Sequence, residues 1–94
     1  MKYVQFEWDE NKNESNKKKH KVSFEEAKTV FYDPAALLIH DPDHYEDEER
    51  FIIMGVSQIL RILVVCHCYR SSDEVIRIIS DRKATRDEKK QYGG

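Results

Sequence analysis

The sequence predicts an α+β domain in which an antiparallel β-sheet carries two N-terminal helices on one face and is followed by a short C-terminal helix. Three segments rich in Val, Ile and Phe follow one another between residues 50 and 80, with only short connections between them. Such connections permit only antiparallel pairing. Capping patterns at Ser23 and Thr85 mark helix starts. A chain of 94 residues with 39% hydrophobic residues can build one core but not two, so we expect a single domain over residues 1–94.

The N-terminal region predicts a strand followed by a polar helix. Residues 3–8 alternate aromatic and polar side chains, as a short strand does. Asp9 is a candidate N-cap for a helix over residues 10–19, which we expect to end at His20 and Lys21. Because this helix is nearly devoid of apolar residues, it would be marginal alone and must be held by its neighbours.

The second helix is predicted to begin at a capping box formed by Ser23 and Glu26 and to stop at Asp33-Pro34. Its apolar residues are spaced to form one stripe: Phe24, Ala27, Val30 and Phe31. The short apolar run at residues 35–40 then predicts the second strand.

Three β-favouring segments make up most of the remaining chain, at residues 50–56, 59–69 and 74–80. Residues 41–48 are too charged to bury and are expected to form a hairpin connection, and short turns are expected around residues 57–58 and 71–73. A second capping box, from Thr85 to Glu88, predicts a short polar helix that ends at about Tyr92.

Charge is distributed unevenly along the chain. The formal net charge is −2, but six of the 18 acidic residues fall within residues 41–49, which leaves 12 acids against 16 lysines and arginines elsewhere. Basic clusters occur at residues 17–21 and 82–86. This asymmetry permits an anionic partner on one side of the molecule, although charge runs commonly serve only to solvate a face.

Two arginines, Arg61 and Arg77, stand in the apolar strands where a β-branched residue would be expected. Since arginine is rarely buried unpaired, each must face solvent or meet an anion. In the functional hypothesis the two form a guanidinium fork for a phosphate, which requires both on one accessible face. In the alternative hypothesis each is exposed or bridges a neighbouring carboxylate. Spacing alone favours the alternative.

No metal or cofactor site is predicted. Cys66 and Cys68 stand two apart in a strand, which differs from the turn spacing of structural zinc sites and prevents a mutual disulfide. His40 and His44 lie in an acidic segment without a recognisable ligand spacing, so a small metal-binding domain rests on these four side chains alone. The absence of a glycine-rich phosphate loop and of a nucleophile elbow argues against nucleotide-dependent enzymes and serine hydrolases.

A cytoplasmic protein with no membrane partner is expected. No apolar run approaches the roughly 18 residues that a membrane span needs. The first residues also lack the apolar region of a secretory signal.

Short segments spread over positions 6 to 92 carry a family resemblance. Those in the first half are Phe6-Glu7-Trp8-Asp9, Asn16, Lys19-His20, residues 22–27, Val30-Phe31 and Asp33-Pro34. Those in the second half are Glu49-Arg50-Phe51, Gly55, Ser57 and residues 61–65, 76–80, 82–85 and 88–92. With this order and spacing the chain resembles the BrnT family. It departs from the family at Lys21, because the family often has glycine after the histidine.

The resemblance implies a toxin of a type II toxin–antitoxin pair, with a RelE-like fold and a ribonuclease activity that blocks translation. It also implies a partner antitoxin similar to BrnA, a ribbon-helix-helix protein that neutralises the toxin and joins it in repressing their operon DNA. The alternative is a non-catalytic module that binds the antitoxin and acts as a transcriptional co-repressor.

For a metal-independent ribonuclease, the resemblance favours a functional role for Arg61 and Arg77, which would hold the phosphate. His20 is the candidate proton carrier in RNA cleavage, and the alternative for it is a solvated histidine at a helix end. The residues expected to bind the RNA backbone are Lys19, Lys21, Arg82 and Lys83.

Overall fold

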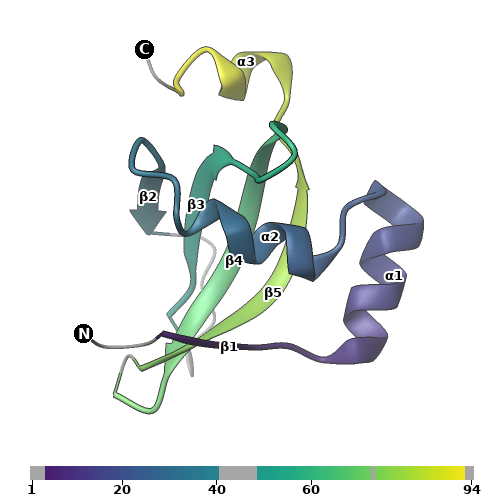
Figure 1. Ribbon diagram of the computed structural model, residues 1–94, viewed down its shortest axis with the longest axis vertical. Helices are drawn as coiled ribbons and strands as arrows, with labels where there is room; N and C mark the ends of the chain where they lie inside the picture. Colours follow the sequence, from purple (N-terminus) through teal and green to yellow (C-terminus); the bar gives the residue numbers. More distant parts are fainter. Residues whose placement is uncertain (1–3, 41–48, 73, 93–94) are drawn as a thin grey trace.

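The computed structural model describes residues 4–40, 49–72 and 74–92 (Figure 1). Its elements in chain order are β1 (Gln5–Glu7), α1 (Glu10–His20), α2 (Phe24–Val30), β2 (Leu37–His40), β3 (Phe51–Val56), β4 (Ile62–Arg70), β5 (Val75–Lys83) and α3 (Arg86–Lys89). The described strands form one five-stranded sheet in the order β1-β5-β4-β3-β2. The α+β prediction is therefore confirmed. The segment at residues 41–48, expected to be a hairpin connection, lies outside the described residues.

The sheet is mixed, so the expectation of an antiparallel sheet was wrong for its first strand. β2, β3, β4 and β5 pair antiparallel in sequence order, but β1 pairs parallel with β5, with Gln5 opposite Val75 and Glu7 opposite Arg77. A tight turn dictates the direction of a neighbouring strand only when it joins the two strands directly. β1 meets its partner after nearly the whole chain has intervened, so no turn sets their relative direction.

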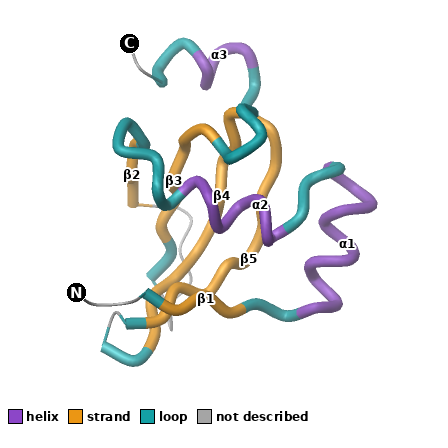
Figure 2. The backbone as a smooth tube through the Cα atoms, in the orientation of Figure 1, coloured by secondary structure: helices purple, strands orange, loops and turns teal. Residues whose placement is uncertain are grey.

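The helices take different positions around the sheet. α2 lies across one face and contacts β3, β4 and β5, whereas α1 stands beside the sheet and packs chiefly on β5 (Figures 1 and 2). α3 follows beyond the end of β5. Of the two N-terminal helices expected to cover one face, α2 does so. Within the described residues, none of the helices is both long enough and apolar enough to cross a membrane.

The main core lies between α2 and the sheet. Its buried residues are Val22, Phe24, Ala27, Val30, Ile53, Leu63, Val65 and Ile78. Phe6, Trp8 and Phe31 pack against this cluster from its margin. Full burial of each large apolar side chain contributes about 1.5–3 kcal/mol, so this cluster supplies much of the force that fixes α2 on the sheet.

Helix α1 is held by buried amides because it has no apolar face. Asn13 and Asn16 are its buried residues. The Oδ1 of Asn13 accepts from the backbone N–H of Phe24 at 2.9 Å, and the Nδ2 of Asn16 donates to the carbonyl of Val22 at 3.0 Å and to the carboxylate of Asp81. These bonds replace apolar packing and fix the helix against α2 and β5.

The two capping patterns behave differently. Thr85 and Glu88 form both halves of a capping box at α3, as predicted. Ser23 caps α2 by accepting from the backbone N–H of Glu26 at 3.1 Å. The predicted capping box at α2 is only half formed. The carboxylate of Glu26 does not bond back to the N-cap, because it turns inward to Ser57 and Arg61.

A β-bulge interrupts the pairing of β4 with β5. Cys66 pairs with Ser80 and His67 with Ile78, so Ile79 has no partner on β4. A shift of one residue exchanges the faces on which side chains lie. Consequently the part of β5 before the bulge and the part after it follow opposite alternations.

Candidate functional site

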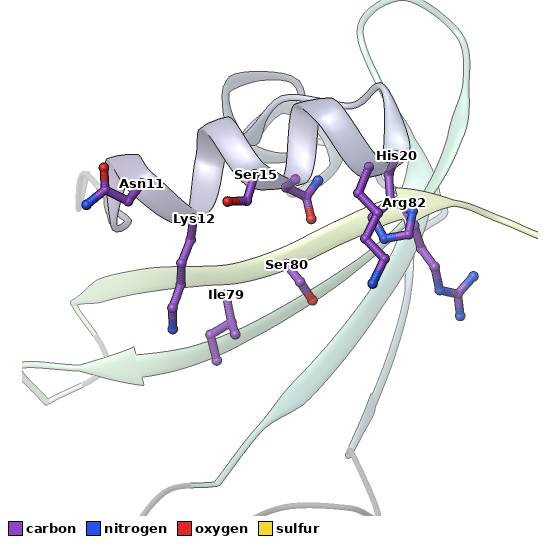
Figure 3. A pocket seen from close by; sticks show the side chains of 9 residues that line it. Asn11, Lys12, Ser15, His20, Ile79, Ser80 and Arg82 are labelled. Atoms are coloured by element: carbon purple, nitrogen blue, oxygen red, sulfur yellow. The ribbon is translucent and has the colours of Figure 1, made fainter.

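A hollow of about 540 Å³ lies between α1 and the part of β5 that β1 does not cover (Figure 3). Lys12, Lys19 and His20 line it from α1, and Arg82 lines it from β5. His20 and Arg82 lie at the same end of the hollow, whereas Asn11 lies at the other. Three of the predicted site residues, Lys19, His20 and Arg82, are thus brought together.

The helix places its lysines in the hollow as a consequence of where its asparagines are buried. Residues three and four apart share a helix face. Lys12, Ser15 and Lys19 follow that spacing, and all three line the hollow. Sequence reasoning missed Lys12 and Ser15. The sequence did contain evidence for them, because Lys12 and Ser15 share a helix face with Lys19 on a helix that has no apolar stripe.

The turn after α1 gives His20 its position. Lys21 is the C-cap in a left-handed conformation, with φ 62° and ψ 30°, and its N–H donates to the carbonyl of Lys17 at 2.9 Å. This is the conformation that glycine adopts without strain, so a lysine here carries a backbone cost. Basic residues in the last turn also interact favourably with the negative end of the helix dipole.

The cations around the hollow differ in how far they are already engaged. Arg82 donates from Nη1 and Nη2 to the two carboxylate oxygens of Glu88, at 2.8 and 2.9 Å. These bonds from Arg82 lower the pKa of Glu88 to about 2. Lys12 and Lys19 form no ion pair with any residue of the described chain. They are therefore the cations most available to an incoming anion.

Arg61 is directed toward α2 and is paired with a buried carboxylate. Its Nε donates to Oε2 of Glu26 at 3.0 Å, and its Nη2 donates to Oε1 of Glu26 and to the carbonyl of Lys21 at 3.2 Å. Burial raises the pKa of Glu26, but hydrogen bonds from Arg61 and Ser57 outweigh it and hold that pKa below its ordinary value. Through Lys21, the guanidinium of Arg61 lies close to the turn that carries His20.

Arg77 lies on the opposite face of the sheet from Arg61. It pairs with Cys68 across the ladder and donates from Nη1 to Glu7 at 2.9 Å. Regular pairing continued from Leu63 and Lys83 would have placed Arg77 opposite Tyr69, on the face of Arg61. The bulge at Ile79 moves it to the other face. The expected fork of Arg61 and Arg77 on one accessible face is therefore not formed.

Lys83 and Lys21 do not line the hollow beside α1. The Nζ of Lys21 donates to the carbonyl of Lys18 at 3.2 Å. Lys83 is the residue after Arg82 on β5, so the two side chains leave the strand on opposite faces. Lys83 and Arg61 line a second, smaller hollow of about 270 Å³. Of the predicted RNA-binding residues, Lys19 and Arg82 thus line the hollow beside α1, Lys83 lines the second hollow, and Lys21 lines neither.

Two titratable groups are buried in the described part of the sheet, Asp81 next to the hollow and His67 within the core on β4. Asp81 is almost fully buried, and burial together with the negative charge of Glu26 raises its pKa to about 8. His67 is completely buried against Phe31, with ring centroids 4.8 Å apart, and burial lowers its pKa to about 4. Both groups are therefore neutral near pH 7.

The structure describes no candidate metal centre in residues 4–40, 49–72 and 74–92, where no group of three or more His, Cys, Asp or Glu side chains comes together. Cys66 and Cys68 form no disulfide bond with any cysteine of the described chain. His44 lies outside the described residues.

Comparisons with known proteins agree with the fold. A family model described as the ribonuclease toxin BrnT of type II toxin–antitoxin systems matches residues 8–88. Among solved structures, the crystal structure of the Brucella abortus ribonuclease toxin BrnT is similar, with a TM-score of 0.67 and 23% sequence identity. The match covers 89% of this chain and 100% of that one. No match is found among curated protein sequences.

Proposed function

The chain belongs to the BrnT family of ribonuclease toxins of type II toxin–antitoxin systems, and on that premise we propose that it is a metal-independent endoribonuclease that cleaves RNA and thereby inhibits translation in the cytoplasm. The observation that carries the proposal is the hollow between α1 and β5. It brings an imidazole into the same hollow as two lysines that have no ion-pair partner within the described residues, Lys19 next to His20 on α1 and Lys12 toward the other end.

RNA cleavage without a metal ion needs three chemical functions. A base takes the proton from a 2′-hydroxyl, the 2′-oxygen attacks the adjacent phosphorus, and the 5′-oxygen leaves with a proton from an acid. Cations stabilise the negative charge of the pentacovalent phosphorane. The products are a 2′,3′-cyclic phosphate and a free 5′-hydroxyl, so the reaction consumes no co-reactant.

His20 is the proposed proton carrier, because its imidazole can both accept and donate a proton near neutral pH. Lys19 is proposed to stabilise the phosphorane, and Lys12, toward the other end of the hollow, is proposed to bind a neighbouring phosphate of the same strand. Arg82 is proposed to contact the RNA backbone at its rim, although its bonds to Glu88 reduce its freedom to move. Arg61 is retained as a phosphate-binding residue and Arg77 is not, since Arg77 lies on the other face.

The partner of this activity is proposed to be an antitoxin similar to BrnA, a ribbon-helix-helix protein that neutralises the toxin and brings it to operator DNA. The family is described as a toxin of type II toxin–antitoxin systems, which supports an antitoxin partner. The assignment of a RelE-like fold belongs to the same proposal.

The decisive test is cleavage of a defined RNA by the purified chain in the presence of EDTA. Lys19→Ala and Lys18→Ala form a matched pair, because both remove an exposed α1 lysine but only Lys19 lines the hollow. We expect wild type and Lys18→Ala to cleave, and His20→Ala and Lys19→Ala to lose at least tenfold in rate. Dependence on added metal, or full activity of folded His20→Ala, would contradict the mechanism.

Expression without the antitoxin separates the enzyme from the non-catalytic alternative. A ribonuclease toxin arrests growth, and the His20→Ala variant relieves the arrest. Indifference of the cells to the wild-type chain would favour a module that only binds its antitoxin and adjusts transcription.

A further inference from the structure

The guanidinium of Arg61 is fixed along one edge by a buried clamp. Glu26 accepts from its Nε and Nη2, and the Oγ of Ser57 donates to the same carboxylate at 2.7 Å. The Nη1 of Arg61 donates to no group of the described chain. These bonds hold the Arg61 side chain in one rotamer and leave the two N–H groups of its Nη1 without an acceptor in the described chain.

Arg61 lines the smaller hollow together with two lysines from other elements. Lys83 comes from the end of β5 and Lys89 from the end of α3. The charged residues that line this hollow are all cationic, and neither lysine forms an ion pair with any described residue. The carboxylate of Glu26 offsets the charge of Arg61, so Arg61, Lys83 and Lys89 bring an excess of about two positive charges to about 270 Å³, and an anion placed between them is attracted there.

From this convergence we infer that Arg61, Lys83 and Lys89 form a phosphate subsite for the RNA strand, and that Glu26 is the positioning residue that aims Arg61 into it. The inference rests on the proposed function, because it identifies RNA as the ligand. The inference adds Lys89 and Glu26 to the proposed site. These residues lie 63 positions apart in the sequence, and Arg61 links them because it bonds to Glu26 and lines the same hollow as Lys89.

RNA suits this hollow better than a single carboxylate from a protein partner. Arg82 and Lys83 are consecutive on β5 and leave it on opposite faces, so one nucleic-acid strand that passes the end of β5 meets both hollows. Leu60, which is 83% exposed, also borders the cations. It offers an apolar surface to a ribose or a base next to the bound phosphate.

The test measures binding of an oligonucleotide that cannot be cleaved, a fluorescein-labelled 12-mer with 2′-O-methyl groups, by anisotropy over a series of salt concentrations. Lys89→Ala and Lys90→Ala are the matched variants, since Lys90 is next in sequence, lies outside the hollow and pairs with Asp87 at 3.7 Å. We expect Lys89→Ala to weaken binding several-fold and to reduce the slope of log K against log salt by about 0.7, the value for one lost contact to a single strand. Lys90→Ala should match wild type.

The positioning role of Glu26 is tested through Arg61→Lys, which keeps the charge but cannot make the two-oxygen contact. We expect its salt slope to match wild type while its affinity falls about tenfold, with KM raised and kcat little changed in cleavage assays. Glu26→Gln should show the same pattern, and Arg61→Lys decides the question if Glu26→Gln does not fold.

The inference is overturned if Lys89→Ala and Lys90→Ala bind the oligonucleotide alike. It is equally overturned if Lys89→Ala leaves this binding intact and weakens only the complex with the antitoxin, which would make the hollow a protein contact. Failure of the wild-type chain to cleave RNA would instead contradict the proposed function, and the binding comparison would still decide the subsite.

Discussion

Asn16 of α1 and Asp81 of β5 are joined side chain to side chain in the buried junction between the two elements, where the Nδ2 of Asn16 donates to Oδ1 of Asp81. The backbone N–H of Asp81 returns a bond to Oδ1 of Asn16 at 3.3 Å. Both residues are buried, so this pair does for α1 what an apolar contact does for an ordinary amphipathic helix. It also lies directly beneath the hollow that we assign to RNA.

Replacing Asn16 by Ala should therefore destabilise the protein by about 2–4 kcal/mol, because it leaves buried polar groups of Asp81 and Val22 without their partner. Urea unfolding measured by circular dichroism checks this. The control is Ser15→Ala on the exposed side of the same turn, which should stay within about 0.5 kcal/mol of wild type. Equal effects of the two variants would show that α1 is not held by its amides.

The stability of the protein should decrease as the pH rises from about 6.5 to 8. The pKa of Asp81 is raised to about 8 in the folded state, so its stabilising contribution is complete below the ordinary aspartate pKa and is lost as the pH passes 8. The pKa of His67 is lowered to about 4, so its contribution is complete above about 6.5 and is lost toward pH 4. The two slopes oppose each other between pH 4 and 6.5.

Between pH 6.5 and 8, of these two groups only Asp81 still changes the stability, by about 1.4 kcal/mol per pH unit at first and less as the pH nears 8, which predicts a loss of about 2 kcal/mol by pH 8. Denaturant midpoints measured at intervals of half a pH unit will reveal it. Asp81→Asn should flatten this region. A decline that persists in Asp81→Asn would assign the effect to another group.

Lys21→Gly should stabilise the protein by about 0.5–1 kcal/mol. Lys21 has a left-handed backbone, with φ 62°, which costs a residue with a Cβ more than it costs glycine, even after the greater chain entropy of glycine is counted. Thermal unfolding is a sufficient measurement. Lys21→Ala removes the same side chain but keeps the strained backbone, so a gain in the alanine variant would point to charge rather than conformation.

Arg77→Ala should leave RNA cleavage within twofold of wild type and cost less than about 1 kcal/mol, since the ion pair of Arg77 with Glu7 is partly exposed. Arg61→Ala should cost about 3–5 kcal/mol, because it leaves the buried carboxylate of Glu26 without its partner. Parallel unfolding and cleavage assays on the two variants give the answer. Loss of cleavage in a folded Arg77→Ala would restore the arginine fork.

Much of the fold was predictable because local chemistry specified it. Asp9, Ser23 and Thr85 cap the three helices, and each accepts the backbone bonds that its residue type predicts. The three long strands carry dense β-branched residues and short turns, which fix both their presence and their antiparallel pairing.

What could not be predicted depends on contacts between distant residues. The direction of β1 is set by a partner some 70 positions away, and the bulge at Ile79 depends on how β5 fits β4. Glu26 has the spacing of a capping box, yet its carboxylate pairs with Arg61 because burial makes an ion pair with a nearby guanidinium more favourable. Of the two lysines that line the hollow, the sequence predicted Lys19, which lies in the basic cluster at residues 17–21, but not Lys12, which lies outside it.

Ile79 also determines how much length variation β5 can accept. Deleting Ile79 alone would remove the bulge and leave Ser80 opposite Cys66 and Ile78 opposite His67, the pairs that they already form. Ile76 and Arg77 would keep their present faces. Deleting Ile78 and Ile79 together would instead set Arg77 opposite His67, so that Arg77 would be driven beneath α2 and Ile76 would be carried to the other face. The gene is therefore expected to tolerate the loss of one codon at this point but not the loss of two.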